Sequence, residues 1–255
     1  MIAQRQPVGL GRAIFAALLV FVLSQLVLIP FGEVDEFHPQ VSLAVAVVVG
    51  VFTFFGNGLA VRTCFEIAFA NRRRQWPAFG VACPTLERTA VGLVVFPFIG
   101  IVALIVGGLI TNALGLDHGT TNIPTVDKSA GFGLLVAVVA VGVAPWAEEV
   151  AFRGFLFGGL MRKVHPVLAA FLAGAAWAGI HGVWAVLFPF TFLGMALCWL
   201  RWYTGSILPG VALHATYNAA ITAYAGPHLA PFWAVLVLVP TVAAVVVTAM
   251  WARRP

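Results

Sequence analysis

The chain has 255 residues, of which 62% are hydrophobic and 9% are charged, against about 25% charged residues in ordinary soluble proteins. This apolar excess excludes a soluble globular protein and an intrinsically disordered one, and three cysteines are too few for a secreted disulfide scaffold. The remaining class is an integral membrane protein, and we predict one all-α transmembrane domain over residues 1–255.

Eight apolar stretches approach or exceed the roughly 20 residues that a membrane-spanning helix needs. In chain order they are Ala13–Pro30, Val41–Val61, Thr89–Leu114, Ala130 to beyond Ala147, Val167–Val183, Ala185–Leu200, Ser206–Ala225 and Phe232–Ala252. Helix is expected in each, because open strands leave unpaired backbone groups in hydrocarbon and these stretches lack the alternation of barrel strands. The sequence therefore predicts a polytopic transmembrane helix bundle of about eight spans.

The charges between these stretches predict the orientation of the chain. With eight spans, one side of the membrane receives twelve basic residues: Arg5, Arg12, Arg62, Arg72, Arg73, Arg74, Arg88, Arg162, Lys163, Arg201, Arg253 and Arg254. The other side receives Lys128 with the acidic residues Glu33, Asp35, Glu36, Asp117 and Asp127. Since cytoplasmic loops are enriched in Lys and Arg, we predict that both termini are cytoplasmic. The net charge of +5 then needs no nucleic-acid partner.

Three charged residues interrupt the fourth stretch: Glu148, Glu149 and Arg153. A charge at the centre of a membrane helix costs about 2.5–3.5 kcal/mol on insertion scales, so it usually marks a functional site. Glu149 and Arg153 are spaced i, i+4 and can pair, whereas Glu148 lies about 100° away. Glu148 is therefore the better candidate for a proton acceptor. In the alternative interpretation, the span ends at Pro145 and the glutamates simply begin the next helix.

Two histidines fall in other predicted spans: His181, and His214 with Asn218 four residues later. A turn is expected at Lys163–Pro166, and counted from Val164, Glu149 lies 15 residues before it and His181 17 residues after it. In an antiparallel hairpin both would lie about 23–25 Å from the turn, and so at one level of the membrane. A histidine in a bundle is usually a hydrogen-bonded core residue, but the coincidence with the glutamates favours a shared site.

These residues form three motifs that resemble those of a known family. They are Glu148-Glu149-Val150-Ala151-Phe152-Arg153 for Glu-Glu-x-x-x-Arg, Trp177-Ala178-Gly179-Ile180-His181 for Phe-x-x-x-His, and His214-Ala215-Thr216-Tyr217-Asn218 for His-x-x-x-Asn or Asp. Over about residues 130–225 the chain resembles the CAAX protease and bacteriocin-processing (CPBP, or Abi) family of intramembrane proteases, which includes the CAAX prenyl protease 2-like enzymes. Trp177 stands where Phe is usual. Since both are large aromatics, we expect this difference to affect packing rather than chemistry.

The resemblance implies an intramembrane endopeptidase that hydrolyses a peptide bond of a membrane-associated peptide or protein. By that resemblance, Glu148 is the general base that activates water, and His181 assists it. His214 and Asn218 would stabilise the oxyanion of the tetrahedral intermediate. Such roles are chemically reasonable, since a carboxylate and an imidazole can orient one water and polar donors can hold developing negative charge.

The same resemblance assigns supporting roles to Glu149, Arg153 and Trp177. It leaves a metal open, because the family has been described both as metalloproteases and as glutamate-dependent proteases. Two histidines and one glutamate match the ligands of some catalytic zinc sites. However, the sequence lacks His-Glu-x-x-His, and Asn218 is a poor zinc ligand. We therefore expect no cofactor and no metal, with zinc as the alternative.

Two other functions use the same residues. One is a non-catalytic membrane protein of this fold, such as a bacteriocin self-immunity factor or a scaffold. The other is a proton-coupled transporter with Glu148 and the histidines as a relay, although the sequence lacks the repeats typical of transporters. The partners expected for a protease are the lipid bilayer and a membrane-associated substrate. The Ala- and Val-rich composition favours the inner membrane of a prokaryotic cell, where a CAAX tail is not the expected substrate.

Overall fold

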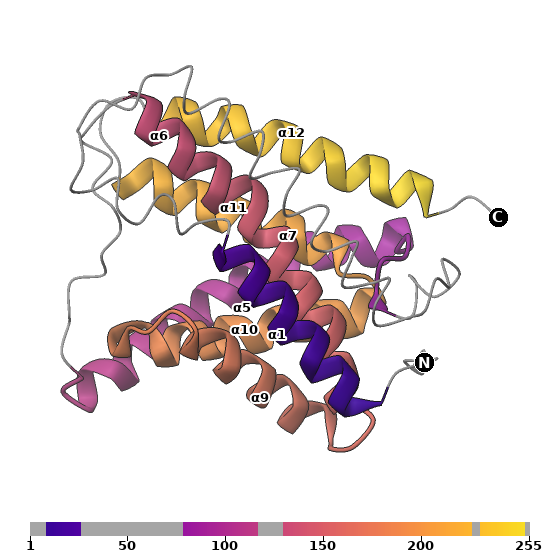
Figure 1. The fold of residues 1–255 in the computed structure, drawn as a ribbon. Coiled ribbons are helices and arrows are strands. Elements are labelled where there is room, and N and C mark those ends of the chain that lie inside the picture. Colours follow the sequence, from indigo (N-terminus) through magenta and orange to yellow (C-terminus); the bar gives the residue numbers. More distant parts are fainter. Residues whose placement is uncertain (1–8, 27–78, 117–129, 226–229, 253–255) are drawn as a thin grey trace.

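The structure is a computed structural model that describes residues 9–26, 79–116, 130–225 and 230–252. Every regular element in these ranges is a helix, which confirms the all-α prediction for this part of the chain (Figure 1). Besides one long helix over residues 130–160, the elements are α1 (Leu10–Leu26), α5 (Leu86–Ala113), α9 (Pro166–Gly179), α10 (Trp184–Thr204), α11 (Leu208–Ala225) and α12 (Ala230–Trp251).

The long helix consists of consecutive segments, two of which are π-helical. They are α6 (Ala130–Ala137), the π-helix η3 (Val138–Val143), α7 (Ala144–Glu148), the π-helix η4 (Glu149–Phe157) and α8 (Gly158–Leu160). Pro145 cannot donate a backbone hydrogen bond and would disturb an ordinary α-helical turn. The wider turn of η3 precedes it, and Ala144 donates its N–H to Val139 O. Because the helix continues through Pro145, the alternative in which the span ends there is wrong.

Four helices of the described chain are long and apolar enough to cross a membrane: Leu86–Ala113, Gly133–Leu160, Trp184–Thr204 and Pro231–Met250. They support an integral membrane protein. Three other predicted spans coincide with helices outside this group, namely α1, α9 and α11, of which α9 has only 14 residues. The predicted span Val41–Val61 lies outside the described residues. The count of eight spans and the cytoplasmic placement of both termini therefore stay predictions.

Two groups of helices pack on the long helix (Figure 1). In one group α10 lies along both α5 and α9, and in the other α11 lies along α12. The helices of the first group pack closely because glycines face the backbone of the neighbouring helix. A Cβ on Gly174 of α9, for example, would lie 2.5 Å from Thr191 O of α10. The segments η3 and α7 contact α11, whereas η4 contacts α9, α10 and α1. Side chains from both groups therefore meet at the junction of α7 and η4.

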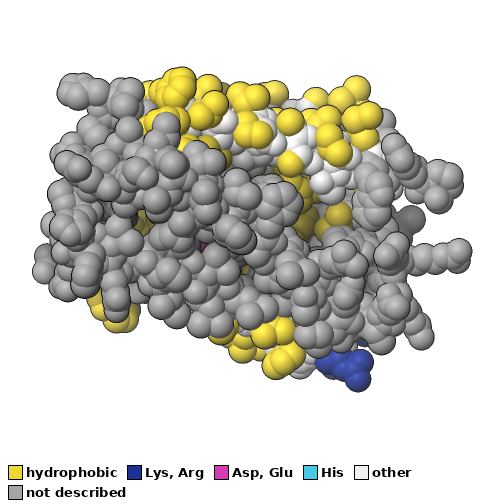
Figure 2. All heavy atoms as spheres, turned by 45° about the horizontal axis from the view of Figure 1, so that its top comes forward, with side chains coloured by type: hydrophobic (Ala, Val, Ile, Leu, Met, Phe, Trp, Pro, Cys, Tyr) yellow, Lys and Arg dark blue, Asp and Glu magenta, His cyan; other side chains and the backbone are white. Residues whose placement is uncertain are grey.

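The outward faces of α5 and α12 are apolar. Phe98, Ile105 and Val239 are among their exposed large hydrophobic residues. Figure 2 shows hydrophobic side chains over much of the described part of one face, with Lys and Arg at one corner of it. A soluble protein rarely exposes so much contiguous apolar surface, and these faces are suited to contact with lipid.

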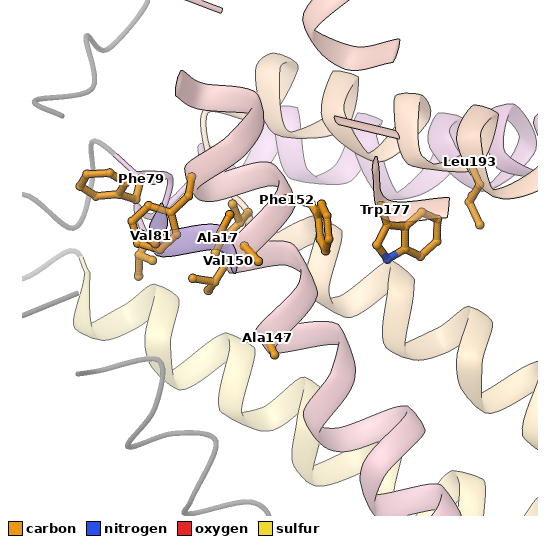
Figure 3. Packing of buried hydrophobic residues seen from close by; sticks show 12 residues of the cluster. Ala17, Phe79, Val81, Ala147, Val150, Phe152, Trp177 and Leu193 are labelled. Carbon is orange, nitrogen blue, oxygen red and sulfur yellow. The ribbon is translucent and has the colours of Figure 1, made fainter. Parts of the chain in front are cut away.

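A buried cluster lies beside the α7–η4 junction. It joins Ala147, Phe152, Trp177 and Leu193 with residues of α1 and of the segment before α5 (Figure 3). Trp177 is 2% exposed, so its indole ring is fixed by packing on several sides. The site described below is therefore bordered by a closely packed wall rather than by a loop.

Candidate active site

The two adjacent glutamates stand at the point where α7 passes into η4, in the middle of the long helix. Their side chains differ in exposure, with 19% of the Glu148 side chain and none of the Glu149 side chain accessible. A buried carboxylate needs paired charges or hydrogen bonds to be tolerated. Glu149 therefore needs compensating partners inside the protein, whereas Glu148 is partly accessible to solvent.

Glu149 lies in a buried group of charged and polar side chains. Its Oε1 is 3.1 Å from the Arg153 guanidinium and 3.2 Å from His214 Nδ1. This confirms the ion pair predicted from the i, i+4 spacing. Its Oε2 has no hydrogen-bond partner among the described residues and lies against Gly210, where a Cβ would come within 2.8 Å of it. Glycine at position 210 thus leaves room for the carboxylate.

His214 connects the two glutamates. Its ring is 3% exposed, with Nδ1 facing Glu149 and Nε2 lying 3.7 Å from Glu148 Oε2. An imidazole ring placed between two carboxylates can donate a hydrogen bond at either nitrogen when both are protonated. The sequence predicted that His214 shares a site with the glutamates, and the distances confirm that these side chains come together.

Trp177 also contacts Glu148 directly. Its indole Nε1 donates a hydrogen bond to Glu148 Oε2 at 2.5 Å, and the Arg153 guanidinium lies 4.6 Å from the ring centroid. The contact of Trp177 is therefore more than packing, because the indole N–H reaches the candidate base, and the expected absence of an effect on the chemistry stays a prediction. The sequence could not show this contact, since it depends on the distance between two helices.

His181 lies just beyond the end of α9, which ends at Gly179, so its predicted place inside a helix is wrong. The residue is exposed at the start of the connection to α10. Its Nδ1 is 2.9 Å from Trp177 O, and its ring packs edge-on against Trp177 and Phe190. Because a carbonyl oxygen only accepts, Nδ1 carries the hydrogen, and Nε2 of a neutral ring is left as an acceptor.

Asn218 lies one turn after His214 on α11 but contacts a different partner. Its Nδ2 donates to Ala140 O in η3 at 2.7 Å. That carbonyl lacks a local donor, because the Ala144 N–H bonds to Val139 O instead and Pro145 has no N–H. Asn218 thus supplies the hydrogen bond that the proline removes. A role in holding an oxyanion would fall to its second amide hydrogen.

The site residues include types that can bind a metal ion, namely His and Glu. Within the described residues, no three side chains of His, Cys, Asp or Glu are grouped so that they could hold one. Glu148, Glu149 and His214 come together, but Glu149 and His214 face each other and Arg153. The zinc alternative is not tested by this arrangement.

Two residues of the site escaped sequence reasoning. Gly210 borders the Glu149 carboxylate, and Phe190 stacks on Trp177 with ring centroids 5.4 Å apart. Neither carries a sequence signal of its own, since glycines and phenylalanines are numerous throughout this chain, at 26 and 21. Pro145 did carry a signal, because a proline inside a helix leaves a free carbonyl one turn earlier, and that carbonyl needs a donor from elsewhere.

Comparison with known proteins adds one match. Residues 130–220 match the family model described as Rce1-like, type II CAAX prenyl endopeptidase. The matched segment includes all three motifs and agrees with the family that they indicate. No curated protein and no solved structure matches the chain.

Proposed function

We propose, from the premise that residues 130–220 belong to the Rce1-like family of CAAX prenyl endopeptidases, that this membrane protein is an intramembrane endopeptidase. Its substrate would be a membrane-associated peptide or protein, cut by a water molecule that Glu148 activates. We place it in the inner membrane of a prokaryotic cell, on the basis of its Ala- and Val-rich composition, with both termini in the cytoplasm.

One observation carries this proposal. Among the clustered polar residues, Glu148 keeps a partly exposed side chain, while Glu149, Arg153 and His214 beside it are buried. Its Oε2 is held by Trp177 and faces His214, and its Oε1 has no hydrogen bond to any described residue. A fixed carboxylate with one oxygen that no described residue binds is suited to orient a water molecule and to accept its proton.

The reaction would proceed through a tetrahedral intermediate. Glu148 takes a proton from water as the oxygen attacks the peptide carbonyl, with His181 Nε2 as a second acceptor for that water. His214 donates from Nε2 to the oxyanion, together with the second amide hydrogen of Asn218. As the C–N bond breaks, the proton on Glu148 passes to the leaving amine. Glu149 and Arg153 would hold His214 in place, and no step requires a metal.

The test is cleavage by the purified full chain in liposomes. Two fluorogenic probes separate the substrate classes: a farnesylated peptide that ends in a CAAX sequence, and an unprenylated apolar peptide. Glu148→Gln should lower the rate at least about 100-fold on any probe that the wild type cuts, since a positioned general base contributes about 100–10,000-fold. Cleavage of the farnesylated probe alone would assign prenyl recognition.

Matched variants control for general damage. Glu87→Gln changes an exposed glutamate in the first turn of α5 and should leave the rate unchanged. His181→Ala should lower the rate, whereas His165→Ala, at the exposed start of α9, should not. Wild-type rates in both Glu148→Gln and His181→Ala would refute the mechanism. A rate abolished by a chelator and restored by zinc would replace it with the metal-dependent alternative.

A further inference from the structure

Trp177 meets four members of the site at once. Its indole N–H bonds to Glu148, its ring lies beside Arg153, and it packs edge-to-face with His181 and His214, with centroids 5.2 and 5.3 Å away. Phe190 stacks on the ring. Trp177 thus connects the α9 side of the site with both the long helix and α11.

The hydrogen bond makes the two oxygens of Glu148 unequal. Oε2 receives the indole N–H and also faces His214, so the carboxylate cannot rotate without losing both contacts. Oε1, which no residue in the described part of the chain binds, is thereby left for a ligand. A hydrogen bond to a charged acceptor is stronger than one between neutral groups, and here both partners are held in a packed region.

We propose that Trp177 is the positioning residue of Glu148, and that it acts through its indole N–H. This inference rests on the proposed function, since it assigns a role within that same site. The aromatic body of the ring has a separate role, because it forms the wall between the two histidines and a flat surface for Arg153. A phenylalanine would retain that wall but has no hydrogen to donate.

A change of the Trp177 side chain to phenylalanine does not remove the hydrogen bond that its backbone makes. His181 Nδ1 bonds to the carbonyl oxygen of Trp177, not to its side chain. Trp177→Phe would therefore keep the orientation of His181 and the aromatic wall while it removes the N–H. This makes the substitution a direct test of one hydrogen bond.

The first experiment needs no substrate. The chain has eight tryptophans, so the proton–nitrogen correlation spectrum of the nitrogen-labelled protein in detergent micelles has one indole signal for each. Trp177→Phe removes and so assigns the Trp177 signal. Because the indole N–H donates to a carboxylate, we expect that signal far downfield, and Glu148→Gln should move it upfield. Trp184, which is 70% exposed, should give a signal that Glu148→Gln leaves in place. A Trp177 signal that does not respond to Glu148→Gln would overturn the inference.

The second experiment measures turnover on whichever probe the wild type cleaves. Trp177→Phe should lower kcat about 10- to 100-fold, the effect of one hydrogen bond to a charged group, and should leave KM nearly unchanged. The matched control Trp184→Phe should retain wild-type kcat. If Trp177→Phe also retains it while Glu148→Gln is inactive, only this inference fails. If Glu148→Gln stays active, the proposed function itself fails.

Discussion

The two sides of the long helix at positions 148 and 149 are built for different tasks. On the Glu149 side, the carboxylate, Arg153 and His214 are all at most 3% exposed and face one another. On the Glu148 side, the carboxylate is partly exposed and one of its oxygens has no hydrogen bond to a described residue. Each carboxylate has one oxygen without a hydrogen bond to a described residue, but that of Glu149 is buried against Gly210, whereas the Glu148 side chain is 19% exposed.

We therefore expect Glu149 to contribute mainly to stability and Glu148 mainly to the reaction. Removing one partner of a buried ion pair is costly because the other charge stays buried without compensation. Removing a partly exposed carboxylate leaves no such charge behind. Neighbouring residues of the same type should therefore give opposite phenotypes, and substitutions can test how sharp the division is.

The largest effect is expected for Glu149→Gln. The variant leaves the Arg153 cation buried without an anion, and breaking a buried pair in this way costs about 3–5 kcal/mol of the free energy of unfolding. We expect a clear fall in the melting temperature in detergent micelles. Glu148→Gln is the matched control and should melt close to the wild type. If the two variants melt at the same temperature, Glu149 does not contribute more to stability than Glu148.

A smaller effect is expected for Gly210→Ala. The added Cβ would lie 2.8 Å from Glu149 Oε2, so the carboxylate must move, and its contacts with Arg153 and His214 are disturbed. Overpacking of this kind costs about 1–3 kcal/mol. Gly179→Ala is the control, because a Cβ there meets nothing within 4 Å. Equal melting temperatures for the two variants would show that Glu149 does not depend on the space at Gly210.

Sequence reasoning succeeded where a short spacing on one helix decides the contact. Glu149 and Arg153 were paired from their i, i+4 separation, and the buried pair follows directly. The long helix was also predicted to pass beyond Ala147, since apolar residues continue on both sides of the glutamates. These features depend on local geometry, which composition and periodicity encode.

Sequence reasoning failed where the outcome depends on contacts between helices. Hydropathy runs on through His181, but α9 ends at Gly179, and Gly182 adopts a φ of +67° in the turn that follows. Glycine permits such a turn, but the hydropathy of the sequence does not change at this point and so does not indicate where the helix ends. The Trp177 hydrogen bond to Glu148 likewise requires the register of α9 against the long helix, which only the packed structure contains.

The smallest effect concerns Asn218, which contacts the long helix away from the glutamates. Asn218→Ala removes the donor to Ala140 O, a half-buried carbonyl, and should cost about 1 kcal/mol of the free energy of unfolding. Pro145→Ala restores a backbone N–H at the position from which a π turn could reach that carbonyl. The double variant should therefore recover stability that Asn218→Ala loses, measured as the coupling in a double-mutant cycle. Additive losses would show that Asn218 does not compensate for the proline.

The same pair of variants also divides the two roles that Asn218 can have. If the asparagine only holds α11 against η3, Pro145→Ala should restore turnover in Asn218→Ala together with stability. If its second amide hydrogen donates to the oxyanion, stability recovers but turnover stays low, since the loss of one such donor costs about 100- to 1,000-fold. Melting and turnover, measured on the same four proteins, therefore distinguish a structural bond to Ala140 from a contribution to the reaction.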